Sequence, residues 1–325
     1  MHWYLGHLQK LLKMMFYGNV EKWSAKLKQV KLANGEYIPA IFFGPDELGY
    51  TPHQLKRDFF HRAYRKLKRL TIDKYNYVNA VASAIECGFH TIDFSAAYGD
   101  GSLMAEAIRK SGVLRKDIII TTRVTNKAQF NGNIEEEFTN QLKGFGTDYI
   151  DILMFHWPVT GCYEKTWEEM LKIKEKGYCR ILGVANCHEH HLKKIKEISG
   201  IYPQINQVEV HPLFTQEKLR KFCYENQIQV QAYSPTGRQD DRLMNPPLLN
   251  DLAQKYSKSK TQIILRWHIQ NGMIPVIRTL NSTHQKTDID IFDFKIDKED
   301  MKKIDSMNIN SRLRYDPDNC DFTTL

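Results

Sequence analysis

The sequence predicts a single (β/α)8 barrel of the TIM type. Eight short apolar segments, rich in β-branched and aromatic residues, alternate with segments of helical periodicity, and polar side chains stand at the ends of several apolar segments. Strands that alternate with helices form a parallel sheet, and closure of that sheet buries both of its faces. A doubly wound open sheet is the alternative, but no GxGxxG motif follows the first strand.

The elements are expected in a regular order. A hairpin should open the fold at residues 30–39, because Asn34-Gly35 between two extended runs is typical of a two-residue turn. Barrel strands are predicted at residues 38–44, 89–95, 117–124, 149–158, 180–187, 205–212, 227–235 and 273–280. Helices are predicted between them at residues 77–87, 103–111, 134–144, 165–176, 189–198, 216–226 and 247–256.

Two segments lie outside this alternation. We expect residues 1–29 to form a helical extension on the barrel, because the apolar run from Trp3 to Tyr17 is too short to span a bilayer and lacks the form of a signal peptide. A membrane-surface or partner-binding helix is the alternative. The barrel then covers residues 30–325, with a basic insertion in the first βα loop at about 45–75. We expect the insertion to be a lid-like decoration or a cap that attracts anions.

Composition limits the partners. Residues 1–75 hold 14 Lys and Arg against 6 Asp and Glu, which accounts for the whole net charge of +8, so the rest of the chain is neutral. We therefore expect no nucleic acid partner. The six cysteines form no CxxC pair, which favours a reducing compartment such as the cytoplasm. We expect no transmembrane segment, and a monomer or weak homodimer.

Four polar residues close to the ends of predicted strands suit a proton relay. They are Asp93, Tyr98, Arg123 and His156, and they supply a carboxylate, a phenol, a cation and an imidazole. An α/β barrel carries its chemistry at the carboxyl ends of its strands, so we expect these side chains to meet there.

Six motifs, in the correct order, resemble the aldo-keto reductase family, especially its shorter bacterial-type members, which are similar to diketogluconate reductases. They are HTIDFSAAYG for the family's HIDTAxxYG, MFHWPV for IHWPV, ILGVANC for IGVSNF, INQVEVHP for NQVExHP, QAYSPTGR for AYSPLGR, and the tail RLRYDPDNCDF for DPDNFDF. The resemblance covers nearly all of residues 30–325 except the insertion. It implies hydride transfer from a reduced nicotinamide to an aldehyde or ketone, possible substrates being sugar-derived or anionic carbonyl compounds.

The resemblance also implies roles for the four polar residues. Tyr98 matches the proton donor and His156 the histidine that orients the carbonyl oxygen. Asp93 matches the aspartate that tunes the tyrosine, and Arg123 stands where the family has a lysine. A tyrosine with a pKa near 10 needs such a neighbouring cation to act as an acid at neutral pH.

The cofactor positions carry over by the same resemblance. They are Gly44, Asn186, Gln207, Tyr233, Ser234, Arg278, Thr279, His284 and Asp288. NADP(H) is favoured over NAD(H), because Arg278 suits a phosphate. Substrate-pocket residues are expected to be Trp157, Thr125, Arg238 and Tyr315. Thr125 stands where a tryptophan is usual, which implies a more open pocket.

Arg123 leaves three interpretations open. The first is an active reductase in which the guanidinium does the work of the lysine with lower turnover. The second is a barrel that binds the nucleotide as a sensor or scaffold, and the third is a modified redox reaction on a sugar-like carbonyl. Metal ligands are suggested by residue type at Cys187 to His191, but we expect no metal, because consecutive helical residues point to different faces.

Overall fold

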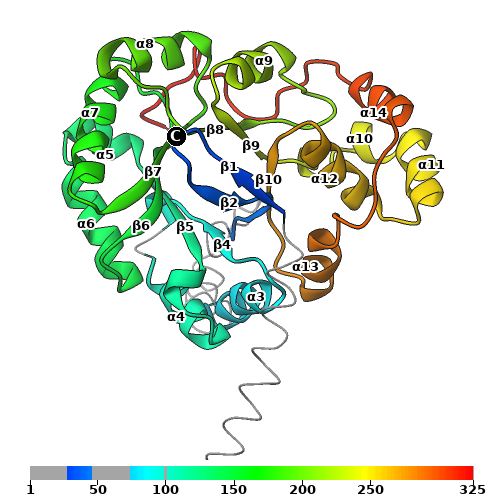
Figure 1. The fold of residues 1–325 in the computed structure, drawn as a ribbon, viewed down its shortest axis with the longest axis horizontal. Coiled ribbons are helices and arrows are strands. Elements are labelled where there is room, and N and C mark those ends of the chain that lie inside the picture. Colours follow the sequence, from blue (N-terminus) through cyan, green and yellow to red (C-terminus); the bar gives the residue numbers. More distant parts are fainter. Residues whose placement is uncertain (1–27, 46–73, 99–100, 325) are drawn as a thin grey trace, which may run out of the picture.

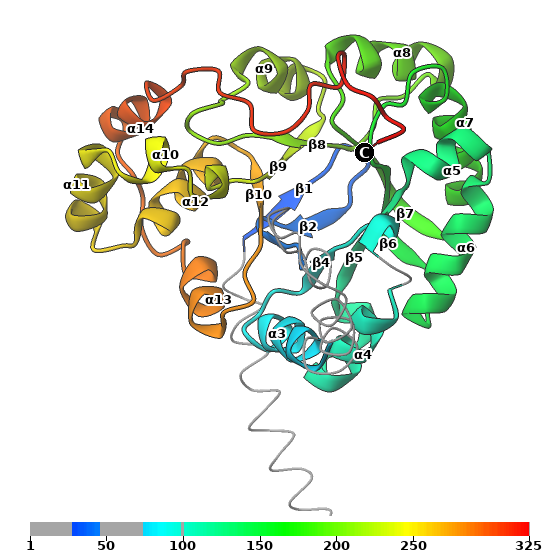
Figure 2. The same cartoon turned by 180° about the vertical axis from the view of Figure 1, so that it is seen from behind.

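The computed structural model describes residues 28–45, 74–98 and 101–324. Figures 1 and 2 show strands in the centre and helices around them. The predicted helical extension and the basic insertion fall, except for their edges, on residues outside the described ranges. None of the described helices is long and apolar enough to cross a membrane.

Eight parallel strands form a nearly closed barrel, which confirms the predicted fold. They are β3 (Phe42–Phe43), β4 (Thr91–Asp93), β5 (Ile119–Val124), β6 (Ile150–Phe155), β7 (Cys179–Ala185), β8 (Ile205–Glu209), β9 (Gln229–Tyr233) and β10 (Ile274–Ile277). Their order in the sheet is β3-β10-β9-β8-β7-β6-β5-β4. A side chain helps to close the ring, because the Phe43 backbone N–H donates to the Thr91 hydroxyl at 3.1 Å.

Each predicted helix is present, with shifts of a few residues at the ends. These helices are α3 (Lys74–Glu86), α4 (Ser102–Ser111), α6 (Ile134–Phe145), α7 (Tyr163–Glu175), α8 (Glu189–Ser199), α9 (Glu217–Glu225) and α11 (Pro247–Tyr256). Further helical elements, which lie outside the predicted helices, are η2 (Ala96–Tyr98), η3 (Arg115–Asp117), α5 (Asn126–Asn131), η4 (Gly237–Gln239), α10 (Asp241–Met244), α12 (Lys260–Gln270), α13 (Ser282–Ile289) and α14 (Lys298–Asp305).

The missed helix α12 has clear local causes. Ser259 accepts the backbone N–H of Gln262, and the Gln262 side chain accepts the backbone N–H of Ser259, which is a capping box. Trp267 and His268 are fully buried, and both imidazole nitrogens of His268 contact backbone carbonyls. The helix is buried on much of its surface, so it lacks the clear alternation of apolar and polar residues that reveals a surface helix.

The N-terminal hairpin is present, but its predicted turn is wrong by one residue. Strands β1 (Gln29–Lys31) and β2 (Tyr37–Pro39) pair antiparallel, and the Leu32 N–H donates to the Glu36 carbonyl at 2.8 Å. Gly35 has φ +88° and donates to the Leu32 carbonyl at 2.9 Å. The connection is therefore a three-residue turn that ends in a left-handed glycine, the next most common hairpin loop.

The hairpin closes one end of the barrel. Its side chains Leu32 and Ile38 share a buried cluster with Ile181 of β7, Ile205 of β8 and Ile274 of β10. These isoleucines lie in the amino-terminal halves of their strands. The opposite, carboxyl end is therefore the one left for chemistry.

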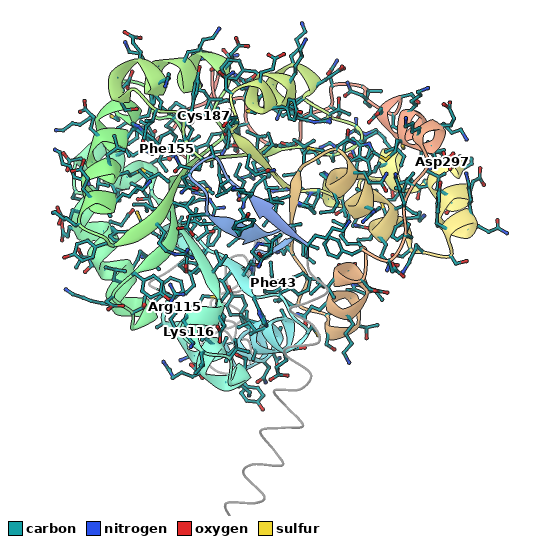
Figure 3. The ribbon with its side chains drawn as sticks, viewed as in Figure 1. Phe43, Arg115, Lys116, Phe155, Cys187 and Asp297 are labelled. Atoms are coloured by element: carbon teal, nitrogen blue, oxygen red, sulfur yellow. The ribbon has the colours of Figure 1, made fainter. Side chains whose placement is uncertain are left out.

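A second buried cluster fills the layer between the strands and the surrounding helices (Figure 3). It includes the fully buried side chains of Phe43, Phe155 and Cys187, which come from three different parts of the ring. All six cysteines lie in the described residues as free thiols.

Gly101 makes a close approach that supports the site. It has φ +82°, and a β-carbon there would lie 2.6 Å from the Phe145 ring. Phe145 packs edge-on against Phe94, whose ring in turn packs edge-on against Tyr98. The absence of a side chain at Gly101 thus leaves room for the edge-on contacts of Phe145 and Phe94 that support Tyr98.

Replacement of this glycine should therefore cost more than backbone strain alone. We expect Gly101→Ala to lower the free energy of unfolding by about 2–4 kcal/mol, because left-handed strain of about 1 kcal/mol adds to the overlap with Phe145. Gly112 is a matched control, with φ +71° and nothing within 4 Å of an added β-carbon. Urea unfolding of both alanine variants gives the comparison, and equal losses would contradict the packing role.

Candidate active site

The structure brings the four predicted relay residues to the carboxyl end of the barrel. Asp93 ends β4, Tyr98 ends η2, Arg123 lies near the end of β5 and His156 directly follows β6. Asp93 and Arg123 are 7% and 3% exposed, so their charges are almost fully removed from water.

Arg123 is bonded to several groups. Its Nη2 lies 2.7 and 2.6 Å from the two carboxylate oxygens of Asp93 and 2.6 Å from Oε1 of Gln207, and its Nη1 donates to the Phe94 carbonyl at 2.5 Å. One nitrogen thus spans both carboxylate oxygens, so the two-nitrogen fork expected of an arginine is not used on Asp93. Among the described residues, these three groups accept all the hydrogen bonds of the guanidinium.

The contacts of Arg123 cross the barrel. Strand β8 lies opposite β4 in the ring, so the guanidinium links Asp93 on one wall to Gln207 on the other. The Gln207 side chain also donates through Nε2 to Asp93 at 3.2 Å and to Gln231 at 3.0 Å. A buried ion pair stabilises only when its remaining polar atoms are satisfied, and these amides do that.

Tyr98 stands beside this network. It is half-buried, its backbone N–H donates to the Ser95 carbonyl at 2.9 Å, and its ring meets the edge of Phe94 with centroids 5.9 Å apart. Since the Phe94 carbonyl accepts from Arg123, the segment that carries the phenol is tied to the cation through its backbone.

His156 is held neutral. Burial, together with the nearby charges of Arg123 and Arg314, lowers its pKa to about 3. Its Nδ1 lies 3.4 Å from the hydroxyl of Ser95, and its backbone carbonyl accepts from the Asn186 side chain at 3.0 Å. At neutral pH the imidazole is therefore a hydrogen-bonding group and carries no charge.

The predicted nicotinamide positions lie at the same carboxyl end of the barrel. Gly44 follows β3, and a β-carbon there would reach 3.7 Å from the Asp93 carboxylate and 3.1 Å from Val276. Asn186 and Ser234 follow β7 and β9 with φ of 60° and 48°. The Tyr233 hydroxyl donates to Asn186 at 2.8 Å, and burial raises its pKa.

The predicted adenine-end residues form a separate group. Arg278 and Thr279 follow β10, while His284 and Asp288 lie on α13, whose first turn is capped by Asn281. Arg278 and His284 are exposed, whereas Asp288 is 8% exposed. Burial raises the pKa of Asp288 to about 6, and the charge of His284 opposes this rise only in part.

The predicted pocket residues divide into two kinds. Trp157 is buried against Phe322 of the tail, and Thr125 caps α5 and donates its hydroxyl to Glu137 at 2.5 Å. Arg238 and Tyr315 are exposed, so they are accessible to a ligand. At the edge of the site, Thr125 thus caps a helix and Trp157 packs against the tail.

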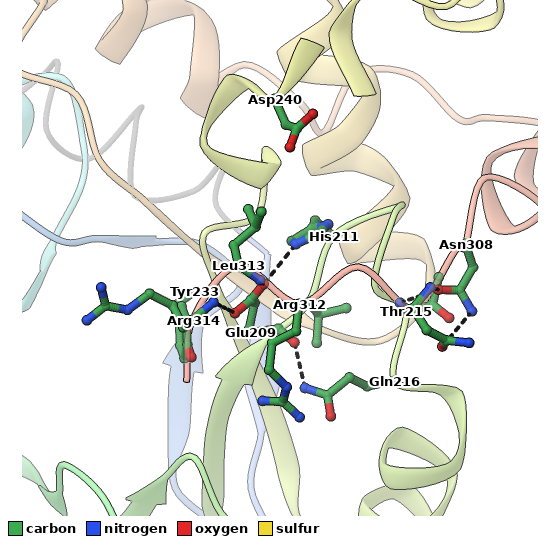
Figure 4. A network of polar contacts seen from close by, with 12 residues as sticks. Glu209, His211, Thr215, Gln216, Tyr233, Asp240, Asn308, Arg312, Leu313 and Arg314 are labelled. Atoms are coloured by element: carbon green, nitrogen blue, oxygen red, sulfur yellow. Dashed lines mark hydrogen bonds and ion pairs between the residues drawn. The ribbon is translucent and has the colours of Figure 1, made fainter. Parts of the chain in front are cut away.

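A buried carboxylate fastens the C-terminal tail across this end (Figure 4). Glu209 accepts from the backbone N–H of Leu313 at 2.6 Å, from that of Arg314 at 2.8 Å, and from His211 at 3.0 Å. Burial alone would raise the pKa of Glu209, but these hydrogen bonds outweigh it and hold that pKa below its ordinary value. The anchor places the half-buried Arg314 close enough for its charge to act on His156 and Tyr233.

A histidine cluster beside the tail corrects one expectation. The rings of His190 and His191 do not diverge, since their centroids are 3.9 Å apart and both face Asp318. His191 Nδ1 accepts the backbone N–H of His188, which leaves the proton on the Nε2 that faces the carboxylate. The ligand atoms of His190, His191 and Asp318 lie close enough together to hold a metal ion, so the expected absence of a metal stays a prediction.

Comparison with known proteins identifies the family. The model described as "Aldo/keto reductase family" matches residues 66–309. The chain belongs to the aldo/keto reductase family. The uncharacterized oxidoreductase YtbE of Bacillus subtilis (strain 168) is 38% identical over 249 residues, which cover 75% of this chain and 88% of YtbE. A glyoxal reductase of the same organism is 35% identical over 239 residues, which cover 74% and 86%.

Solved structures of the family have the same fold. The aldo-keto reductase MGS-M4, from a Medee basin deep-sea metagenome library, has a TM-score of 0.79 at 30% identity and covers 90% of this chain and 99% of its own. The Bombyx mori aldo-keto reductase in complex with NADP has a TM-score of 0.77 at 30% identity, with 90% and 96% covered.

Two residues of this aldo/keto reductase site were missed from sequence. Ser95 contacts His156, and Gln231 accepts from Gln207. The signal for Gln231 was available, because Gln229, Gln231 and Tyr233 alternate along β9 and place polar groups on one face. Ser95 lies in a short loop after its strand, so no strand alternation marks it.

The raised pKa of Asp288 predicts how the stability of the protein depends on pH. Its raised pKa means that the folded protein binds its proton more tightly than the unfolded chain does, so stability falls as pH rises from about 4 to 6. Asp288→Asn should therefore raise the free energy of unfolding above pH 6 by up to about 3 kcal/mol and change it little below pH 4. Denaturant titrations at pH 4 and pH 8 measure this; an equal effect at both would contradict the buried-carboxylate account.

Proposed function

We propose that this aldo/keto reductase reduces an aldehyde or ketone to an alcohol with NADPH, and that Tyr98 donates the proton. The observation that carries the proposal is the buried Asp93–Arg123 pair beside Tyr98 and the neutral His156, all at one end of the barrel. A phenol can donate a proton to the carbonyl oxygen, and a cation and a neutral imidazole can stabilise the negative charge that develops there.

The residues present fit a nicotinamide nucleotide. Gly44 leaves open the space beside Asp93 that a side chain would fill, and the buried side chains of Asn186 and Gln207 supply amides at the same end of the barrel. When bound, the nicotinamide supplies the hydride for the carbonyl carbon. At the far end Arg278 would bind the 2′-phosphate, which favours NADP(H) over NAD(H).

The mechanism then assigns a task to each side chain. His156, being neutral, donates a hydrogen bond to the carbonyl oxygen and orients the substrate. Tyr98 transfers its hydroxyl proton to that oxygen as the hydride reaches the carbon, which gives the alcohol. Arg123, held by Asp93, supplies the positive charge that favours the tyrosinate left behind.

The positive charge at this end of the barrel favours anionic substrates. Arg314 is near enough to lower the pKa of His156, and the charges of Arg238, Arg312 and Arg314 all act on Tyr233. A positive potential over an opening attracts carboxylated or phosphorylated carbonyl compounds, sugar acids among them.

The enzymatic proposal predicts NADPH consumption. We expect loss of NADPH absorbance with a panel of aldehydes, faster with carboxylated members than with neutral ones at low salt, and a loss of at least 100-fold in kcat for Tyr98→Phe. If NADPH binds and neither protein consumes it, while a known reductase does, the enzyme proposal fails for that panel.

The competing function is a nucleotide-binding barrel with little catalysis. It is favoured by one contact, since the Gln207 oxygen that could hold the carboxamide accepts from Arg123 at 2.6 Å. A sensor or scaffold would bind NADPH and leave the carbonyl panel unchanged, which is the outcome just described.

Arg123 itself provides a mechanistic prediction. We expect Arg123→Lys to raise kcat by roughly tenfold, because a lysine keeps the charge beside Asp93 and has no second branch to hold both Phe94 and Gln207. Steady-state kinetics with the best substrate of the panel measure it, and Arg123→Met is the control that removes the charge. A large loss in the lysine variant would show that the guanidinium is needed for different chemistry.

A further inference from the structure

Ser95 occupies an enclosed position behind the imidazole. It is 0% exposed, and its hydroxyl oxygen lies 3.4 Å from Nδ1 of His156 and 3.3 Å from the backbone nitrogen of Ala97. In the motif HIDTAxxYG an alanine stands at this position, so the hydroxyl is a departure of this chain from that motif.

The direction of the hydrogen bond follows from a count of donors. A serine oxygen has one hydrogen and two lone pairs, and the Ala97 N–H uses one lone pair. A buried hydroxyl hydrogen needs an acceptor. Among the described residues, Nδ1 of His156 is the acceptor within reach, so the hydroxyl donates to Nδ1.

Because His156 is neutral, this hydrogen bond decides which ring nitrogen carries the proton. The neutral ring carries one proton, which sits either on Nδ1 or on Nε2. The Ser95 hydroxyl is the one side-chain group hydrogen-bonded to the ring among the described residues, since Trp157 only packs near it, with centroids 6.4 Å apart. A donor at Nδ1 therefore selects the tautomer that carries its proton on Nε2.

We propose that Ser95 is a positioning residue that keeps the proton of His156 on Nε2. This inference rests on the proposed function, in which His156 must donate a hydrogen bond to the carbonyl oxygen. The opposite tautomer would present a lone pair to that oxygen and repel it. Ser95 thus acts through His156 and has no contact with the substrate.

The direct test is the tautomer itself. Long-range proton–nitrogen correlation spectra of protein labelled with 15N-histidine distinguish the two forms, and His156→Gln identifies the signal. We expect the Nε2–H form in the wild type and in Ser95→Thr, and a mixture of tautomers in Ser95→Ala. Nδ1–H in the wild type, or the same population in wild type and Ser95→Ala, would overturn the proposal.

Kinetics supply a second readout. We expect Ser95→Ala to lower kcat about tenfold with the KM for NADPH little changed, and Ser95→Thr to restore most of it. Equal loss in the alanine and threonine variants would indicate a packing role and overturn the proposal. The spectra need neither substrate nor turnover, so failure of the reductase proposal leaves this test intact. The wild-type spectrum alone decides if the alanine variant does not fold.

Discussion

A cation and an anion that are nearly removed from water organise the carboxyl end of this barrel. The Arg123 guanidinium joins Asp93 on β4 to Gln207 on the opposite wall, and its second nitrogen holds the backbone that leads to Tyr98. Loss of one member of a buried pair leaves the other charge uncompensated, which typically costs about 3–5 kcal/mol. The geometry of the relay, the space beside Gly44 and the position of Gln207 all depend on this contact.

A second buried carboxylate, farther from the relay, is stabilised in the same way. Glu209 is buried and satisfied by three donors, and through them it fixes the C-terminal tail and the charge of Arg314. A buried carboxylate is stable only when it is hydrogen-bonded, so the groups that donate to it are held in fixed positions. The C-terminal tail is thereby tied to the end of β8.

The fold could be predicted from sequence because strand and helix periods are local properties. All eight strands were found, and Asp93, Arg123 and His156 were placed correctly because each lies at or next to the end of a strand. Helix α12 was missed because burial removes its periodicity. The contacts of Arg123 with Gln207, and of Ser95 with His156, join residues 84 and 61 positions apart, so no local pattern reports them. Only the closed barrel brings these pairs together.

A crystal structure of the cofactor-free protein would test the central claim most directly. We predict that one guanidinium nitrogen of Arg123 lies within about 3.2 Å of both the Asp93 carboxylate and the Gln207 side-chain oxygen, with the other nitrogen on the Phe94 carbonyl. A guanidinium turned to the Tyr98 hydroxyl, with Gln207 more than about 4 Å away, would contradict the account.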